Sequence, residues 1–485
     1  MDNTNPNSSN SGNRRSASFF AVTTAALNLA VFRIAVFGGL LYVGGTHPNH
    51  ATWFSSVPEV LQIPPPGWEG VFRTLIPSDP VVVANLHGIF LASATLAMVG
   101  QWTRVTTWLT ILTGLITLGL PQFFGKLNHF HHLWWFGFLL ATSPCSDALS
   151  LDSWRRGESW RGARTGPEYA LPLRFAWLLI GLIYFFPGVW KLSSCGLAWV
   201  LSDNLQWLLY DKWTELGGFL PVLRIDRIPW VYRTAALGTI LFEVGFLPAL
   251  LVPRLRPWAV AGGMLFHLSA WKFMGINFVL LVICYVAFID WAALLRSTSL
   301  RMPGGPIPKL PPGGSRICYL RQTTVAGSLL LLANGVCGTL GVDSWPFAVY
   351  PRFNYFQQPT RFATSITVHN DDGRSVTVDD SELQRRLSPS RHSNLMQRIA
   401  RRPSPALLEG FTELLLTNAE VEVRGELVVW RETLAIHPER WAENPLGREP
   451  LWVVDLGTRG TGTGDLSTRK PAERTPGVAE NEDPE

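Results

Sequence analysis

Long apolar runs limit what this sequence can fold into more than any other feature. Several of them contain roughly 17 to 25 residues, the length that crosses a hydrocarbon core of about 30 Å as a helix. Charged side chains make up only 16% of the chain, whereas about a quarter is usual in soluble domains. We therefore expect an all-α polytopic membrane helix bundle with about nine spans. The expected spans cover residues 19–43, 80–100, 104–122, 128–144, 171–191, 235–252, 257–272, 275–294 and 323–343.

The first 18 residues are polar and rich in Asn and Ser. Arg14 and Arg15 stand just before the first apolar run, so a cleaved signal peptide is one alternative. The run from Phe19 to Val43 is longer than the apolar part of a signal peptide, and no A-x-A cleavage pattern ends it. We expect an uncleaved first span.

The distribution of basic residues predicts an orientation, because cytoplasmic loops carry more Lys and Arg than outer loops. If the N-terminus is inside, the cluster Arg155, Arg156, Arg161 and Arg164 is also inside. Lys191, at the end of the fifth span, then faces the outside. The asparagine-rich start and the lack of an organellar signal favour a bacterial inner membrane, with a cytoplasmic N-terminus and an extracytoplasmic C-terminal domain.

Two regions outside the spans have recognisable patterns. Residues 195–213 place aromatic and aliphatic side chains at helical spacing, which predicts a helix in the membrane interface that covers the Lys191 end. Alternation around a D-D-G turn predicts a β-hairpin at 363–378. Residues 380–417 are expected to be helical, and 421–436 and 451–457 to be strands.

These patterns divide the chain into four parts. The expected parts are a disordered N-terminus at 1–18, a transmembrane domain at 19–345, a small extracytoplasmic α+β domain at 346–456 and a disordered tail at 457–485.

Ionisable side chains in or at the edge of a span cost at least about 2.5 kcal/mol on insertion scales, so each calls for a partner or a task. Lys191, Glu243, His267 and Lys272 are the strongest set. A lysine that is buried and kept neutral can act as a base or nucleophile. The alternative is snorkelling, in which Lys191 lifts its ammonium group to the lipid headgroups.

Glu243 lies near the middle of its span. Because a buried carboxylate needs a partner, we expect it to pair with an arginine such as Arg33 or Arg174, and a structural role is as plausible as a functional one.

Histidines offer a second group of candidates. His267 and Trp271 are four residues apart and share a helix face, with Lys272 one position farther round. A histidine that only packs is the alternative. His129 and His132 are three residues apart, but no third ligand stands near them, so no metal site is expected.

Several function classes are excluded. The arginines are spread over short loops rather than gathered on one face with interleaved aromatic residues, so no nucleic acid partner is expected. The five cysteines form no C-x-x-C pair and imply neither a disulfide framework nor a zinc site. No nucleotide-binding loop, G-x-S-x-G elbow or H-E-x-x-H motif occurs.

The order of these elements resembles the HTTM (horizontally transferred transmembrane) superfamily, which includes the vitamin K-dependent γ-glutamyl carboxylases. The resemblance covers roughly residues 19 to 345. It rests on Asn128-His129 opening a span, S-L-D at Ser150 to Asp152, PGVWKL at the end of the fifth span, Glu243 followed by Gly245, and FHLSAWKFMGINF around His267.

The resemblance implies a chemistry. In the carboxylases a G-V-K-K-L segment carries the base that deprotonates vitamin K hydroquinone, and G-V-W-K-L here places Lys191 on that base and Trp190 on the preceding lysine. The implied site has Lys191 as base, with His267 and Glu243 beside it. Trp190, Trp271 and Lys272 are candidates for binding the cofactor, which is reduced vitamin K or menaquinol.

The sequence also departs from the carboxylases. A histidine shortly before their S-x-D is represented here by Asp147, which the expected topology puts on the side opposite Lys191. The external domain is much shorter than theirs, which puts docking of a protein or peptide substrate in doubt.

Two hypotheses therefore stay open. One is a quinol-linked membrane enzyme with a lysine base, for which glutamyl carboxylation is the more specific version. The other is a non-catalytic module that binds the lipid bilayer and presents the external domain. A transporter is a third and weaker alternative.

Overall fold

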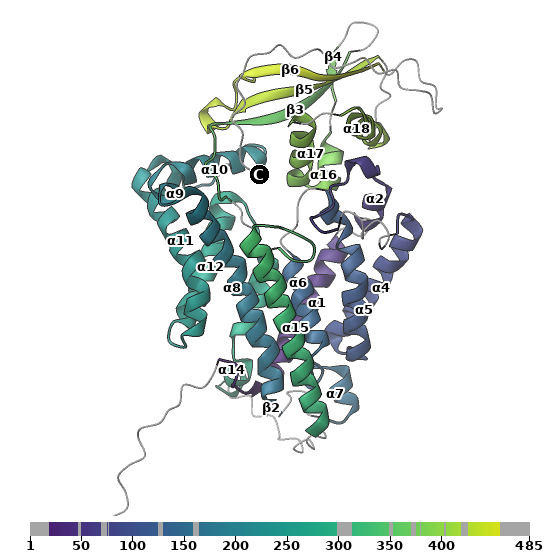
Figure 1. The fold of residues 1–485 in the computed structure, drawn as a ribbon, viewed down its shortest axis with the longest axis vertical. Helices are drawn as coiled ribbons and strands as arrows, with labels where there is room; N and C mark the ends of the chain where they lie inside the picture. Colours follow the sequence, from purple (N-terminus) through teal and green to yellow (C-terminus); the bar gives the residue numbers. More distant parts are fainter. Residues whose placement is uncertain are drawn as a thin grey trace, which may run out of the picture.

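The computed structural model describes residues 19–46, 50–68, 75, 77–124, 130–158, 164–297, 313–348, 353–369, 375–378, 380–401, 404–418 and 425–455. A bundle of helices makes up most of it, and a small sheet with three helices lies at one end (Figure 1). The helices of the bundle are α1 (Ala26–Thr46), α2 (His50–Ser56), α4 (Pro80–Val99), α5 (Thr103–Thr117), α6 (His131–Ala141), α7 (Leu151–Arg155), α8 (Pro167–Cys195), α9 (Ala198–Leu201), α10 (Asn204–Glu215), α11 (Pro229–Leu251), α12 (Arg256–Met274), α13 (Val279–Ile283), α14 (Trp291–Ser297) and α15 (Gly313–Leu340).

Short elements join these helices. Strands β1 (Thr24–Ala25) and β2 (Thr165–Gly166) pair antiparallel and tie the start of α1 to the start of α8. Single 3₁₀ turns cover Glu59–Leu61, Leu120–Phe123, Ile225–Arg227, Cys284–Phe288 and Pro438–Arg440.

Six helical segments in the described part of the chain are long and apolar enough to cross a membrane. They are Ala26–Thr46, Pro80–Val99, Thr103–Phe123, Pro167–Cys195, Pro229–Leu251 and Arg316–Leu340. The multi-pass membrane character is therefore confirmed.

The expected number of nine spans is not confirmed. Within the span expected at 128–144, α6 is only 11 residues long. Helix α12 has 19 residues but includes two basic residues and His267, and it is not among the six. The span expected at 275–294 is not one helix, because α13 passes into the 3₁₀ turn at Cys284–Phe288 and Ile289 is extended before α14 begins. Gly275, with a φ of 64°, ends α12 just before this segment.

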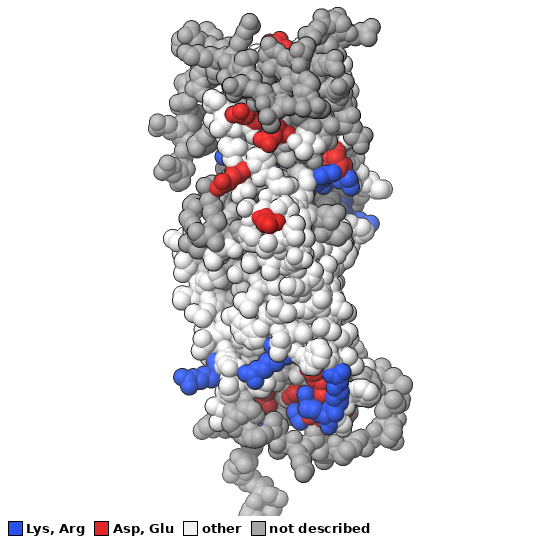
Figure 2. Space-filling model, turned by 90° about the vertical axis from the view of Figure 1, so that its right-hand side faces the viewer, with Lys and Arg blue, Asp and Glu red and all other residues white. Residues whose placement is uncertain are grey.

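The outer surface of the bundle fits a lipid environment. Figure 2 shows one face on which charged side chains lie toward the two ends, with a wide band free of them between. Large apolar side chains that would be unusual on a soluble surface are exposed along the spans. Examples are Val81, Ile89, Leu112, Leu241, Leu329 and Leu332.

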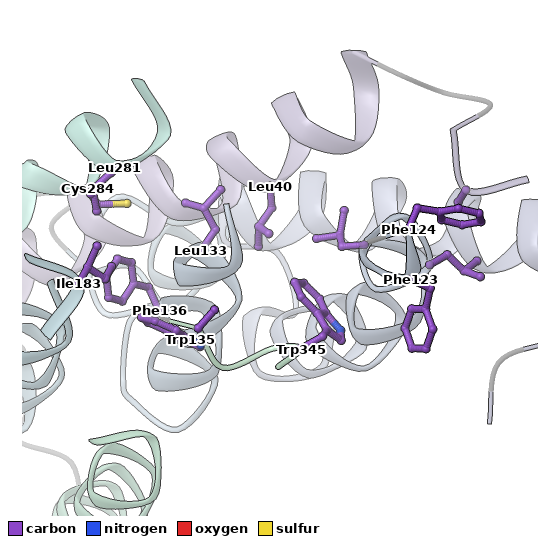
Figure 3. Close-up of a cluster of buried hydrophobic side chains, with 14 of the residues drawn as sticks. Leu40, Phe123, Phe124, Leu133, Trp135, Phe136, Ile183, Leu281, Cys284 and Trp345 are labelled. Atoms are coloured by element: carbon purple, nitrogen blue, oxygen red, sulfur yellow. The ribbon is translucent and has the colours of Figure 1, made fainter. Parts of the chain in front are cut away.

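Aromatic side chains form much of the bundle's core (Figure 3). Trp135 and Phe136 of α6 are fully buried, and Leu40 of α1 and Ile183 of α8 belong to the same cluster. The segment after α15 folds back into this core, since Trp345 is buried and donates a hydrogen bond to the carbonyl of Leu115 at 2.9 Å. Buried indoles need such a partner for their N–H group.

The C-terminal part contains a four-stranded antiparallel sheet with the order β4-β3-β5-β6. Its strands are β3 (Thr360–His369), β4 (Ser375–Thr377), β5 (Glu426–Ala435) and β6 (Gly447–Asp455), with Ser365 opposite Trp430 and a bulge beside Val429. The helices α16 (Ser381–Leu387), α17 (Pro389–Arg401) and α18 (Pro405–Asn418) belong to the same part. The strands β3 and β4 form the predicted hairpin.

The sheet part rests on α10, beside the end of the bundle that carries α9 (Figure 1). Arg361 of β3 pairs with Asp211 of α10 at 3.3 Å. Trp441 donates a hydrogen bond to the hydroxyl of Thr214 at 3.0 Å. The segment 195–213, expected as one interfacial helix, forms the two short helices α9 and α10 at this end.

Candidate functional site: a buried lysine–glutamate pair between two spans

Lys191 and Glu243 form an ion pair between α8 and α11. The Lys191 Nζ lies 2.8 Å from each carboxylate oxygen of Glu243. Relative exposure is 3% for Lys191 and 5% for Glu243. The amine therefore does not lie among the lipid headgroups, and the snorkelling alternative does not describe this lysine.

A glycine brings the two helices together at this point. A Cβ atom at Gly188 would lie 2.8 Å from the Cβ of Glu243 and 3.1 Å from the backbone nitrogen of Val244. Only a residue without a side chain permits so close an approach. Because Gly188 is three residues before Lys191, it places the lysine on the face of α8 that meets Glu243.

Trp199 of α9 covers the amine. Its ring centroid is 5.5 Å from the Nζ of Lys191, within the range of a cation–π contact. The indole is held in place by a hydrogen bond of 2.7 Å from its Nε1 to the carbonyl of Phe353. A buried tryptophan of the interfacial segment thus lies against Lys191, as the sequence predicted for that segment.

A second polar group lies on the same side of α8. The hydroxyl of Tyr184 lies 2.5 Å from Nε2 of His267 and 2.7 Å from the hydroxyl of Tyr285. Gly263 makes room for this arrangement, because a Cβ there would collide with the Tyr285 hydroxyl. The Nδ1 atom of His267 is buried and has no hydrogen-bond partner among the residues that the structure describes.

The two polar groups are joined by aromatic packing. Tyr184 precedes Lys191 by seven residues, or two helical turns, so both side chains project from one face of α8. Phe242 and Phe246 pack on Tyr184 with ring centroids at 4.9 Å and 4.7 Å, and they flank Glu243 along α11. The structure therefore brings Lys191 and Glu243 into contact. It places His267 beside Tyr184, two helical turns along α8 from that pair.

The other predicted site residues lie elsewhere. Trp190 faces α15, where its Nε1 donates to the carbonyl of Gly338 at 2.7 Å. Trp271 is 51% exposed, and Lys272 is exposed with its ammonium 4.3 Å from the ring centroid of Trp271. None of the three contacts the Lys191–Glu243 pair through a bond that the structure shows.

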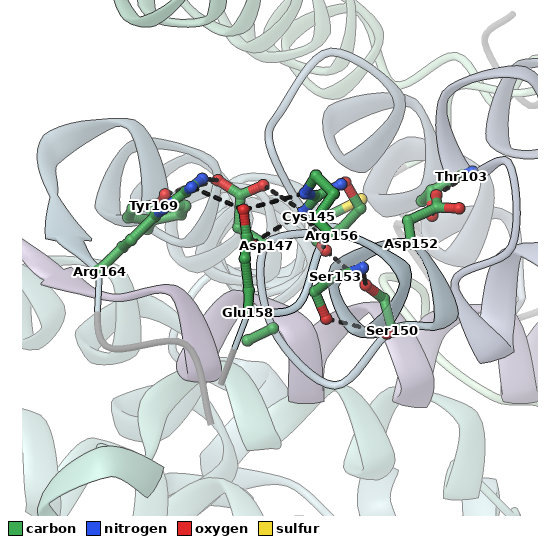
Figure 4. Close-up of polar contacts among 12 residues, drawn as sticks. Thr103, Cys145, Asp147, Ser150, Asp152, Ser153, Arg156, Glu158, Arg164 and Tyr169 are labelled. Carbon is green, nitrogen blue, oxygen red and sulfur yellow. Dashed lines mark hydrogen bonds and ion pairs between the residues drawn. The ribbon is translucent and has the colours of Figure 1, made fainter. Parts of the chain in front are cut away.

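Asp147 belongs to a separate ion cluster near the start of α8 (Figure 4). Its carboxylate pairs with Arg156 at 3.3 Å and Arg164 at 3.1 Å, and accepts a hydrogen bond of 2.7 Å from the hydroxyl of Tyr169. Lys191 lies four residues from the other end of this long helix. Asp147 and Lys191 therefore do not cooperate in one site.

The S-L-D motif caps two helices. Ser150 caps α7 by accepting from the amide of Ser153, and Asp152 accepts from the amides of Trp102 and Thr103 at the start of α5. Burial opposes ionisation of Asp152, but the hydrogen bonds from Thr103 and Trp102 outweigh it and lower the pKa of this carboxyl below its usual range. The motif has a structural explanation that involves no contact with Lys191.

Two expected partners of Glu243 are bound elsewhere, so that prediction was wrong. Arg33 is fully buried and donates to backbone carbonyls, among them those of Cys145 at 2.7 Å and Leu149 at 2.5 Å. Arg174 stacks over the ring of Trp177. Arg174 lies on α8 as well, but near the other end of that helix from Lys191, so Lys191 is the residue of α8 that meets Glu243.

The histidines around the start of α6 lie only partly within the described residues. Asn128 and His129 lie outside the described residues. His132 is buried, and no group of three or more His, Cys, Asp or Glu side chains in the described ranges could hold a metal ion.

Sequence reasoning missed Tyr184, Tyr285 and Trp199. The spacing of Tyr184 from Lys191 was a usable signal, since a tyrosine seven residues before a lysine shares its helix face. Trp199 belongs to the segment 195–213 that was expected to cover Lys191, although it was not singled out, and no signal pointed to Tyr285, which lies far away in the sequence.

A family model for the HTTM domain matches residues 20–291, which is more than half of the chain. No curated protein and no solved structure matches this chain. The matched region includes α8, α11 and α12, the helices that carry Lys191, Glu243 and His267. The chain therefore belongs to the HTTM domain family.

Proposed function

We propose that this protein is a membrane enzyme in which Lys191 and Glu243 act together as a base toward a lipid-soluble quinol. The observation that carries the proposal is the contact of the Lys191 amine with both Glu243 oxygens, buried between two spans and covered by Trp199. An ionisable pair inside a membrane is costly, and such pairs most often serve ion or proton chemistry.

The pair can take up a proton in either of its two forms. As an ion pair it offers the carboxylate of Glu243, and as an uncharged pair it offers the amine of Lys191. Because the two groups are in contact, a proton can pass directly from one to the other. Little water reaches them, so a proton taken from a weakly acidic hydroxyl stays on the pair instead of exchanging at once with solvent.

The surrounding residues suit a ring that carries hydroxyl groups. Trp199 and Phe242 offer flat apolar surfaces near the pair. The Nδ1 atom of His267, which no described residue binds, can hydrogen-bond to an oxygen, and Tyr184 holds that imidazole in place. Reduced vitamin K or menaquinol fits this set of groups, and would supply the acidic hydroxyl and the electrons for a reaction with oxygen. Carboxylation of a glutamyl group in a protein or peptide is the more specific reaction that family membership suggests.

We place the protein in a bacterial inner membrane, with the arginine-rich end of the bundle in the cytoplasm. Arg156, Arg164 and Arg316 are at the end where α8 begins, and the sheet is at the opposite end. Since cytoplasmic loops are the richer in basic residues, the sheet part would be extracytoplasmic, on the side of Lys191.

The test compares purified full-length proteins in detergent, supplied with menaquinol or vitamin K hydroquinone, oxygen and labelled bicarbonate. General base catalysis contributes about a hundredfold or more, so Lys191→Ala should lower quinol oxidation by at least that factor. Lys272→Ala, which removes an exposed lysine, should oxidise quinol like the wild type. Equal quinol oxidation by wild type and Lys191→Ala would remove the catalytic role of Lys191. Transfer of the label from bicarbonate into protein would show carboxylation in addition to quinol oxidation.

A non-catalytic module is the second candidate, and the attachment of the sheet to the bundle favours it. Arg361 pairs with Asp211, and Trp441 binds Thr214, so α10 holds the sheet beside the membrane part. A wild-type protein that neither binds nor oxidises quinol would support this alternative.

A further inference from the structure

Arg174 and Arg256 converge on one tryptophan. The guanidinium carbons of Arg174 and Arg256 lie 3.9 Å and 5.5 Å from the ring centroid of Trp177. Both also lie near the ring of Phe19, at 5.0 Å and 5.6 Å. Two positive side chains from α8 and α12, which are remote in sequence, thus share one aromatic surface.

These two arginines have no carboxylate partner among the described residues. Arg174 is only 9% exposed, and its Nη1 atom is buried without a hydrogen-bond partner. Arg256 is partly exposed and uses its Nε to donate to the carbonyl of Leu250 at 2.6 Å. Like charges in a partly dry site repel each other, and an unmatched buried cation is costly. The site therefore calls for an anion.

The position of the pair is where lipid headgroups are expected. Arg174 lies two turns into α8, and Arg256 is the first residue of α12. Exposed apolar side chains lie beside them in the chain, namely Phe20, Leu255 and Trp258, together with the exposed Arg254. An exposed tryptophan beside basic residues at the end of a helix is typical of the membrane–water interface.

We infer that Arg174 and Arg256 bind the phosphate group of an anionic glycerophospholipid. Guanidinium groups form paired hydrogen bonds with phosphate oxygens, and the unused Nη1 of Arg174 supplies one donor. Trp177 holds the two guanidinium groups close to each other, since both lie near its ring. The Nε1 of Trp177 donates a hydrogen bond of 2.9 Å to the carbonyl of Ala287. The acyl chains would lie along the exposed apolar surface of the bundle. A free phosphate has the same headgroup chemistry, and the experiment separates the two sources.

The test uses the delipidated full-length protein in detergent. Native mass spectrometry measures retention of phosphatidylglycerol and, at equal concentration, of a diacylglycerol with the same chains. We expect the wild type to retain phosphatidylglycerol at least about tenfold more strongly, because hydrogen bonds between charged groups are the strong ones. Arg174→Gln combined with Arg256→Gln should remove that preference. Arg254→Gln is the matched control, since it removes a charge from the same turn and should stay within twofold of the wild type.

Other outcomes overturn the inference. Equal retention of phosphatidylglycerol by the wild type and the double variant, or equal retention of the two lipids by the wild type, would exclude a phosphate site at these arginines. Inorganic phosphate is tested alone by its effect on the melting temperature. A stabilisation that depends on Arg174, with none from phosphatidylglycerol, would exclude the lipid as ligand. If Arg174→Gln does not fold, Arg256→Gln alone provides the comparison, because that side chain is partly exposed.

Discussion

Lys191 donates to both carboxylate oxygens of Glu243 at 2.8 Å, while only 4% and 6% of the two side chains is exposed. A buried ion pair is often no more stabilising than well-packed apolar residues of similar volume. Stability alone therefore gives no reason for a lysine and a glutamate at these positions. We attribute the pair to proton chemistry, and its energetics can be measured separately from any activity.

Breaking the pair on one side should be much more harmful than replacing both sides. Lys191→Met leaves the Glu243 carboxylate buried without a partner, and we expect the free energy of unfolding to fall by about 3–5 kcal/mol. Lys191→Met combined with Glu243→Leu should recover most of that loss. Unfolding in detergent measures the free energy of unfolding of the single and the double variant. A double variant as unstable as the single one would contradict the assignment of the loss to an unpaired charge.

The close approach at Gly188 predicts an asymmetry between two glycines. Gly188→Ala should lower the free energy of unfolding by about 1–3 kcal/mol, because its Cβ would press on Glu243 and Val244. Gly245→Ala on α11 is the matched control, since a Cβ there has nothing within 4 Å. It should be neutral or stabilising by about 0.5–1 kcal/mol from helix propensity. Equal effects at the two positions would argue against the contact.

Tyr184 is the centre of its hydrogen-bonded group, so its loss should matter more than that of Tyr285. Tyr184→Phe leaves both His267 and Tyr285 without their partner, each at a cost of about 1–3 kcal/mol. Tyr285→Phe removes only the outer hydroxyl. Thermal unfolding of the two variants should rank them in this order, and the reverse order would show that Tyr184 is not the shared partner.

The lowered pKa of Asp152 predicts a pH-dependent contribution to stability. The folded-state pKa lies below the value of about 3.9 that an unfolded Asp has, so the contribution is fully present above about pH 4. It is lost as the pH falls through the folded-state pKa. Asp152→Asn should therefore be less stable than the wild type near pH 6, by about 1 kcal/mol for a weakened helix cap. The difference should narrow below about pH 4 in melting curves at several pH values. A difference that stays constant down to acidic pH would contradict an ionised cap.

Burial predicts different reactivity for two lysines. Lys272 is exposed and should react readily with a water-soluble amine reagent, whereas Lys191, covered by Trp199, should react at least about tenfold more slowly. Trp199→Ala should raise the labelling of Lys191 and leave that of Lys272 unchanged. Peptide mass spectrometry after brief labelling measures both. Rapid labelling of Lys191 in the wild type would show that water reaches the amine, and would remove the basis for a shielded base.

The sequence alone determined the class of the protein and its membrane spans in outline, and it predicted Lys191 as a candidate site residue. Each of these depends on local information, namely the length of apolar runs and the cost of a charge within them. The spans at 128–144 and 275–294 were overestimated because apolar composition does not show where a helix ends. Helix α6 stops at Ala141, and an extended Ile289 separates the 3₁₀ turn at Cys284–Phe288 from α14.

Only the tertiary structure decided which partner Lys191 has. Glu243 was a visible candidate, but arginines were expected beside it, since a helix sequence shows which face a residue occupies and not which helix that face meets. The contact depends on Gly188, whose lack of a side chain lets α8 touch α11. Tyr285 reaches the site from an element far away in the chain, so its position follows from packing rather than from any local pattern.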